Sequence, residues 1–127
     1  MDEVVKGWLK VAENDFASAG SLAKDELFES ACFHCQQAAE KYLKSYLIAH
    51  KKQFLKVHDL EYLVKLSQKI DSEFEKIRKS AQMLTDFVIM YRYPLDEPVT
   101  CSEGDFKRSY ENMKRIRDFV LNKLEKP

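Results

Sequence analysis

The sequence is poor in the residues that interrupt helices, with three glycines and three prolines among 127 residues. Pro94, Pro98 and Gly104 all lie between positions 93 and 104, so the long segments on either side hold few strong breakers. Apolar residues in those segments recur every three or four positions and do not alternate with polar ones. This pattern predicts helices and gives no competing signal for strands.

The chain also lacks an excess of charge, because 21 basic and 21 acidic side chains cancel. A net charge of zero removes the bulk attraction of a typical nucleic-acid binder, so any phosphate contact must come from a local group of cations. The three cysteines are an odd number, which argues against a disulfide framework.

Long apolar runs are missing as well, since none approaches the roughly 20 residues that cross a bilayer. Asp2 and Glu3 stand where a signal peptide has basic residues, and no apolar segment of the signal-peptide kind follows. We therefore expect a cytoplasmic protein without a membrane partner.

The length of the chain suits one domain, residues 1–127, with a single core. We predict an all-α fold, an up-and-down bundle of four long helices plus one short helix. The expected helices run from about 2 to 24 and from about 27 to 52, followed by a short one capped by Asp59. A fourth helix begins at Asp71 or Ser72 and ends before Pro94, and Asp105 caps the last.

The same periodicity predicts which side chains face the core, Trp8 among them. The expected inward residues are Val5, Trp8, Leu9, Ala12, Phe16, Ala19, Leu22, Ala31, Cys35, Ala38, Ala39, Tyr42, Leu43, Tyr46, Leu47, Leu60, Leu63, Val64, Leu66, Phe74, Ile77, Ala81, Leu84, Phe87, Val88, Tyr91, Phe106, Tyr110, Met113, Ile116, Val120, Leu121 and Leu124. Cys32 and Cys35 lie three positions apart, and we interpret them as buried thiols rather than as metal ligands, so no metal or other cofactor is expected.

Several segments together resemble the HEPN family of prokaryotic helical domains. Residues 8–15 read WLKVAEND and are similar to the family's first helix. Residues 33–47 read FHCQQAAEKYLKSYL and carry the most specific similarity, to the second helix. The landmarks His58-Asp59-Leu60 and Tyr91-Arg92-Tyr93-Pro94 follow in the family's order. The resemblance therefore spans nearly the whole chain.

The resemblance implies a helical bundle that forms a homodimer and partners a minimal nucleotidyltransferase in a toxin–antitoxin-like pair. It also implies nucleotide binding and, in some branches, metal-independent cleavage of RNA. The cleaving branches share an arginine followed, about four to six residues later, by a histidine that moves a proton.

This chain departs from that catalytic pattern. Its histidines are His34, His50 and His58, whereas its first arginine is Arg78, so no arginine precedes any histidine. We therefore expect a binding module and not an enzyme. Two alternatives stay open: a ribonuclease with an atypical site, for which His58 of a second subunit is the candidate base, and a purely structural dimerisation domain.

The candidate residues for binding a nucleotide, a phosphate or RNA are Arg92, Tyr91, Tyr93, Lys41 and His58. A guanidinium binds phosphate in a fork, and tyrosines stack on bases. The alternative for this group is that Pro94 only ends a helix and Arg92 pairs with a carboxylate such as Asp96.

As structural or interface residues we expect Trp8, Asp15, Gln37, Glu40 and Pro94. We also consider Tyr93 as an acceptor of a nucleotidyl group from the partner.

Overall fold

The structure is a computed structural model, and it describes residues 1–53, 57–92 and 100–125, with the backbone alone at 86–92. The described chain holds five α-helices and one 3₁₀ helix, and none of it is a strand. They are α1 (Glu3–Lys24), α2 (Phe28–Ala49), α3 (Leu60–Gln68), η1 (Ser72–Ile77), α4 (Arg78–Arg92) and α5 (Glu103–Glu125). The prediction of an all-α bundle is confirmed.

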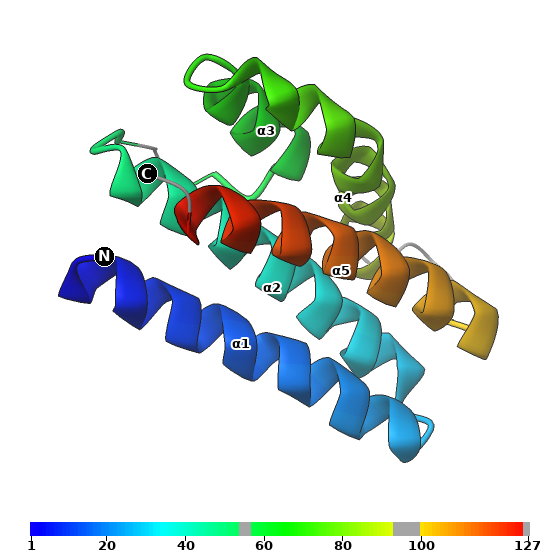
Figure 1. Ribbon diagram of the computed structural model, residues 1–127. Coiled ribbons are helices and arrows are strands. Elements are labelled where there is room, and N and C mark those ends of the chain that lie inside the picture. Colours follow the sequence, from blue (N-terminus) through cyan, green and yellow to red (C-terminus); the bar gives the residue numbers. More distant parts are fainter. Residues whose placement is uncertain (54–56, 93–99, 126–127) are drawn as a thin grey trace.

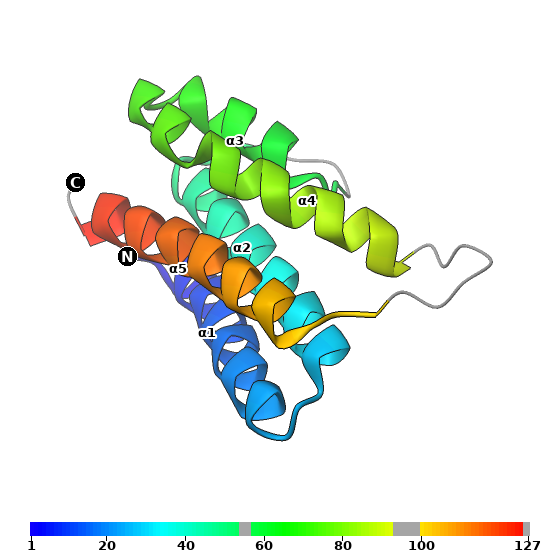
Figure 2. The ribbon, with the colours of Figure 1, turned by 90° about the vertical axis from the view of Figure 1, so that its right-hand side faces the viewer.

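Helix α2 lies in the middle of the bundle and contacts α1, α3, α4 and α5. Figures 1 and 2 show α1 and α5 on one side of α2 and the α3–α4 pair on the other. The side chains of Ala38 and Ala39 on α2 are fully buried, which fits the close approach of neighbouring helices that such small residues allow. Among the described residues, no helix combines the length and the apolar composition that crossing a bilayer requires.

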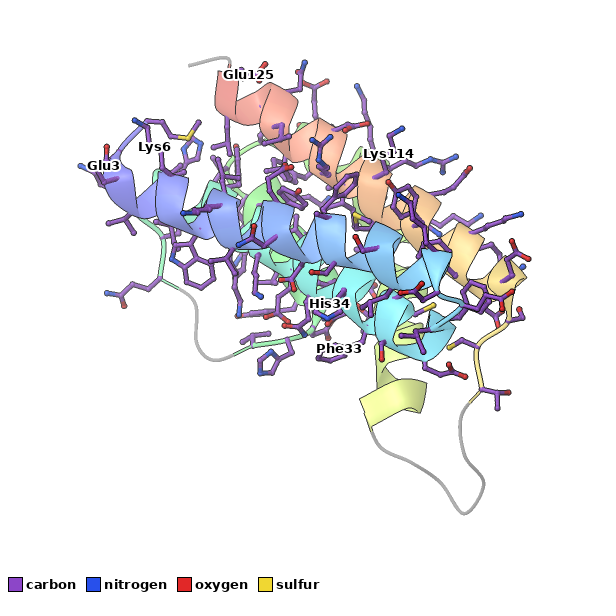
Figure 3. The ribbon with its side chains drawn as sticks, turned by 90° about the horizontal axis from the view of Figure 1, so that it is seen from below. Glu3, Lys6, Phe33, His34, Lys114 and Glu125 are labelled. Carbon is purple, nitrogen blue, oxygen red and sulfur yellow. The ribbon has the colours of Figure 1, made fainter. Side chains whose placement is uncertain are left out.

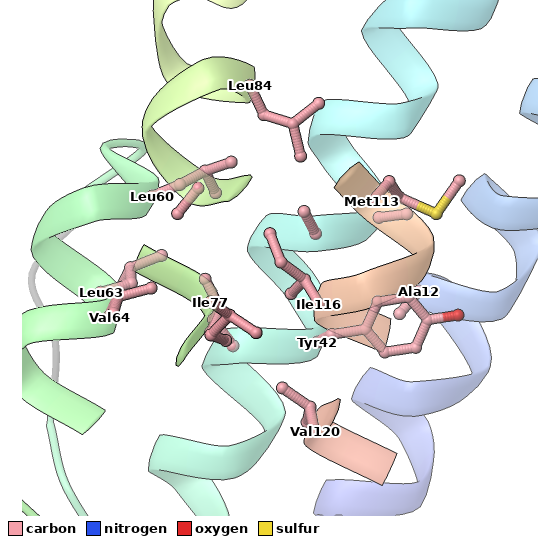
Figure 4. Close-up of a cluster of buried hydrophobic side chains, with 14 of the residues drawn as sticks. Ala12, Tyr42, Leu60, Leu63, Val64, Ile77, Leu84, Met113, Ile116 and Val120 are labelled. Carbon is pink, nitrogen blue, oxygen red and sulfur yellow. The ribbon is translucent and has the colours of Figure 1, made fainter. Parts of the chain in front are cut away.

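The core is formed by the apolar faces that the periodicity predicts. Figure 4 shows its centre, where Tyr42 of α2 lies among Ile116 and Met113 of α5 and Ala12 of α1. Most of the expected inward residues are buried, and Leu9, Phe16, Leu66, Phe106, Tyr110, Leu121 and Leu124 are partly buried against the same cluster. Trp8 and Leu22 are exceptions, because both are partly exposed and neither belongs to this core cluster or packs against it. The expected positions Phe87, Val88 and Tyr91 belong to the part of α4 described by its backbone alone.

The expected fourth helix is divided in two. The segment after Asp71 is a 3₁₀ helix, and the α-helix begins only at Arg78. The Asp71 side chain accepts a hydrogen bond from the Glu73 N–H at 3.0 Å, which caps the tight first turn. Side chains three positions apart are aligned in a 3₁₀ helix, so Phe74 and Ile77 both reach the core.

Two further helix ends differ from the prediction. Helix α2 ends at Ala49 and not near Lys52, because Lys51 turns into the left-handed region with φ of 56° and the Lys52 N–H bonds back to the Leu47 carbonyl at 2.9 Å. Helix α5 is capped by Ser102 and not by Asp105. The Ser102 hydroxyl accepts from the Asp105 N–H and the Asp105 carboxylate accepts from the Ser102 N–H, each at 3.0 Å, which is a capping box.

Lys123, near the end of α5, forms ion pairs with two carboxylates at the start of η1. Its ammonium lies 2.7 Å from the Asp71 carboxylate and 2.5 Å from the Glu73 carboxylate. Hydrogen bonds from Lys123, and then from Lys76, lower the pKa of Glu73 to about 2. The bond from Lys123 also lowers the pKa of Asp71.

We predict that Lys123→Met lowers stability at neutral pH and that the loss disappears in acid. A carboxyl whose pKa is lowered by folding stabilises the fold above its unfolded pKa, and this contribution is lost as the pH falls through the folded pKa. The difference in free energy of unfolding between wild type and variant should therefore shrink as the pH falls from about 4.5 to about 2. Urea denaturation at several pH values measures it. Lys107→Met, which removes an exposed pair with Glu103, is the control, and a pH-independent difference for Lys123→Met contradicts the prediction.

Candidate functional site

The first part of the candidate site is a carboxylate held between two helices. Asp15 on α1 is buried, with 12% of its side chain exposed. One of its oxygens lies 2.8 Å from His34 Nδ1, and the other accepts from the Lys41 ammonium at 2.5 Å. His34 and Lys41 are seven positions apart on α2, about two helical turns, so both face α1.

The direction of the His34–Asp15 hydrogen bond follows from the acceptor. Because an ionised carboxylate only accepts hydrogen bonds, His34 Nδ1 is assigned as the donor in this contact. In Figure 3, which views the bundle from the α1 side, His34 and Phe33 lie along the edge of α1 that is turned away from α5. The edge of the His34 ring contacts the neighbouring Phe33 ring, with centroids 5.8 Å apart. Helices α1 and α2 are thus joined by a charged group that stays at the rim of the bundle.

The second part is a more deeply buried network around Glu40 of α2, whose side chain is 5% exposed. Lys44 donates to one Glu40 oxygen at 3.1 Å, and His58 Nδ1 lies 3.1 Å from the other. Gln36 donates to Glu40 at 3.3 Å and to the His58 carbonyl at 3.4 Å. Gln37 donates to Gln36 at 2.7 Å, so the network runs from the surface of α2 to the residue before the cap of α3.

Charge compensation explains how these groups tolerate burial. A buried carboxylate without partners costs several kcal/mol, but Asp15 and Glu40 each have an ammonium group of α2 at hydrogen-bond distance. No described, fully buried side-chain nitrogen or oxygen is left without a partner. In both clusters the carboxylate is therefore paired with a lysine, and the fully buried polar atoms are hydrogen-bonded.

His58 is the exposed imidazole of the Glu40 network. Its imidazole is 53% exposed while Nδ1 is held by Glu40. No described residue forms a hydrogen bond with the other nitrogen, Nε2, of this half-exposed ring. An imidazole oriented in this way is able to donate or accept a proton or to hydrogen-bond a ligand.

Trp8 was expected in the core, and the structure corrects this. Its side chain lines a surface hollow of about 470 Å³ together with Val4, Val11 and Lys41. Val4 is 61% exposed and Val11 is 46% exposed. The reason is that positions 4, 8, 11 and 15 form a second stripe on α1, next to the buried one, and this stripe ends at Asp15 beside Lys41.

The structure thus brings together six of the residues singled out from the sequence. Asp15, Lys41 and Trp8 lie at the α1–α2 edge, and Gln37, Glu40 and His58 belong to the Glu40 network. The side chains of Tyr91 and Arg92 are not described, although the backbone of both closes α4. Tyr93 and Pro94 lie outside the described residues. For these four the assigned roles stay predictions.

A third polar contact was not expected from the sequence. Tyr42 donates to Glu13 of α1 at 2.8 Å, and Arg117 of α5 donates to both oxygens of the same carboxylate at 3.1 and 3.4 Å. Burial, then the contact with Glu13, raises the pKa of Tyr42. The Arg117 guanidinium also lies 4.6 Å from the centre of the Phe16 ring. Glu13 and Arg117 are far apart in sequence, and neither belongs to a local pattern that would have linked them.

Two of the cysteines lie near the N-terminal end of α2. Cys32 and Cys35 are fully buried, and burial raises the pKa of both thiols. Cys32 lies beside Cys101 and Ser109 of the α5 end of the bundle. Among the described residues, no three His, Cys, Asp or Glu side chains are placed to hold a metal ion together.

Comparisons with known proteins agree with the geometry of the bundle. A family model described as the HEPN domain matches residues 5–124. A solved structure described as ST0689, an archaeal HEPN homologue, is 25% identical, with a TM-score of 0.76 over 97% of this chain and 98% of that one. The protein TT1696 from Thermus thermophilus is 24% identical, with a TM-score of 0.84 over 96% and 99%, and shows the fold alone. No protein with a curated description matches significantly.

We predict that Asp15→Asn destabilises the fold by about 1–3 kcal/mol, because Lys41 and His34 lose a charged acceptor at a mostly buried site. Chemical denaturation measures the effect. The matched control is Asp118→Asn, whose carboxylate is 55% exposed and pairs with Arg117, and a change below about 0.5 kcal/mol is expected there. Equal effects of the two variants would show that the α1–α2 contact adds nothing to stability.

Proposed function

The chain belongs to the HEPN family, whose model covers residues 5–124, and we propose that it is a binding module rather than a self-sufficient enzyme. In this proposal the protein forms a homodimer and partners a minimal nucleotidyltransferase in a toxin–antitoxin-like pair. The partner supplies the chemistry, and this chain supplies recognition, including the binding of a nucleotide.

The observation that carries the proposal is how the chain uses its histidines. All three precede the first arginine, so the Arg–His order of the family's cleaving branches does not occur. His34 and His58 instead hydrogen-bond Asp15 and Glu40 inside networks that join helices. Cleavage of RNA needs a proton carrier next to a group that stabilises phosphate charge. Histidines engaged in helix contacts favour a recognition role over that one.

The α1–α2 edge offers groups that suit a nucleotide. Trp8, an aromatic side chain of the kind that stacks on bases, and Lys41 line the same hollow, and a phosphate that contacts the Lys41 ammonium competes there with the Asp15 carboxylate. His58 adds an exposed imidazole nitrogen at the neighbouring Glu40 network. Tyr91, Arg92 and Tyr93 remain candidates beside these residues, and Tyr93 remains the candidate for modification by the partner.

One observation favours a second candidate function, a ribonuclease with an atypical site. Glu40 contacts Nδ1 of the half-exposed His58 imidazole, and a carboxylate that orients an imidazole is the arrangement used by many general bases. Such a site also needs a guanidinium, which Arg92 of a second subunit would have to provide.

The two candidates separate in an RNA cleavage assay in EDTA. We expect that the wild-type protein leaves RNA intact, since no arginine precedes a histidine in the sequence. Gel analysis of a labelled RNA measures this, with Arg92→Ala and His58→Ala as matched variants. Cleavage by wild type that both variants abolish would establish the ribonuclease and reject the binding module.

The partnership is tested by co-expression with minimal nucleotidyltransferases from the source organism. We expect that one of them co-purifies with this chain as a stoichiometric complex. Intact-mass measurement then shows whether the chain gains one or more nucleotide units, and Tyr93→Phe identifies the acceptor. A stable dimer that retains neither a nucleotidyltransferase nor a nucleotide would contradict the proposal and leave a structural dimerisation domain.

A further inference from the structure

A second hollow lies at the other end of α2, away from the cysteines. It has a volume of about 350 Å³ and is lined by His50, Lys52, Gln53, Leu66, Lys69 and Ile70. These residues come from the C-terminal ends of α2 and α3, which lie on the same side of the molecule in Figure 1. Among the described residues, the hollow shares no lining residue with the Trp8–Lys41 hollow.

The cations at this hollow are not needed to complete the helix ends. The Tyr46 and Leu47 carbonyls of α2 accept from the N–H groups of His50 and Lys52 at 3.2 and 2.9 Å. The Leu66 carbonyl of α3 likewise accepts from the Lys69 N–H at 3.3 Å. Backbone bonds therefore cap both helices, and the side chains of His50, Lys52 and Lys69 stay available. The dipoles of the helices favour cations here, but they do not require that two lysines and an imidazole surround one hollow.

The positive charge of this hollow is not cancelled by nearby acids. Within the described residues, no carboxylate forms an ion pair with Lys52, Lys69 or His50. The carboxylates that come next in the chain, those of Asp71 and Glu73, are held by Lys123. This contrasts with Lys41 and Lys44 of the same helix α2, each of which is neutralised by a buried carboxylate.

The remaining lining determines what kind of anion fits. Leu66 and Ile70 pack against the core with part of their surface exposed, so they offer an apolar floor. The His50 imidazole lies against the Tyr46 ring, with centroids 4.5 Å apart, and Tyr46 in turn packs on Phe74 at 4.4 Å. The His50 imidazole is therefore held in position by its contact with Tyr46. An apolar floor beneath several donors is the usual composition of a small-molecule site, and 350 Å³ lies in the usual size range.

We propose that this hollow binds a small phosphate ester with an aromatic or aliphatic body. The phosphate contacts the Lys52 and Lys69 ammonium groups and the His50 imidazole, and the body lies on Leu66 and Ile70. Gln53 provides an amide for a polar substituent. The proposal is independent of the partnership with a nucleotidyltransferase, because it rests on residues that the α1–α2 site does not contain.

Isothermal titration with phenyl phosphate tests the proposal, with inorganic phosphate and phenol as half-ligands. We expect saturable binding of phenyl phosphate that is tighter than that of either half-ligand. Lys52→Met and Lys69→Met should each weaken it about tenfold, since each removes one charged donor to the phosphate. The matched control is Lys114→Met, since Lys114 is an exposed lysine on the outer face of α5, as Figure 3 shows, and its loss should leave binding unchanged.

A thermal melt of each variant verifies that it folds, and methyl NMR shifts of Leu66 and Ile70 provide a second measurement in the wild type. Three outcomes would overturn the proposal. They are no saturable binding of phenyl phosphate, equal affinity in wild type and both lysine variants, and equal affinity for inorganic phosphate and phenyl phosphate.

Discussion

The fold depends on the burial of α2 on almost all sides. Of its 22 residues 13 are buried, and these include Gln36, Glu40, Lys44 and Ser45. A helix in this position cannot leave its polar side chains to water, so each must find a partner inside the protein. Asp15, His58 and the other networked groups meet that requirement. They thereby also fix how α1 and the start of α3 lie against α2, which is what places the candidate site.

The sequence predicts the helices well because their signals are local. Apolar spacing and the Asp59 cap depend on residues within one or two turns, and the structure has α3 starting directly after that cap, which accepts from the N–H groups of Glu61 and Tyr62. The errors lie where local signals allow two outcomes. Asp71 caps a 3₁₀ helix as well as an α-helix, and packing of Phe74 and Ile77 decides between them. Ser102 and Asp105 both suit an N-cap, and only the reciprocal bonds show which residue holds that position.

The candidate site was predictable only in part. Asp15, Gln37 and Glu40 stand out through the resemblance, and their partners His34, Gln36 and Lys44 lie in the similar segment of α2, but the sequence does not show which residue pairs with which. Spacing along one helix predicts which residues share a face, and it predicts this for His34, Gln37 and Lys41. It does not identify what lies opposite, which is why the Glu13–Arg117 contact was missed. Trp8 was misplaced because two neighbouring stripes on α1 have the same spacing, and only one of them is covered.

The balance of charge along α2 separates two kinds of recognition. In the Asp15 and Glu40 clusters every cation has a carboxylate beside it, so an incoming anion would have to displace a buried partner. Under the proposed function, such a surface recognises a ligand by shape and through the Trp8 and His58 side chains rather than by unpaired charge. At the other end of the helix His50, Lys52 and Lys69 have no such partner in the part of the chain that the structure describes, so an anion would meet charge that only water compensates. The net charge of the chain is zero, but its charges are unequally distributed. The free energy of binding a phosphate group should therefore be more favourable at the lysines that have no carboxylate partner.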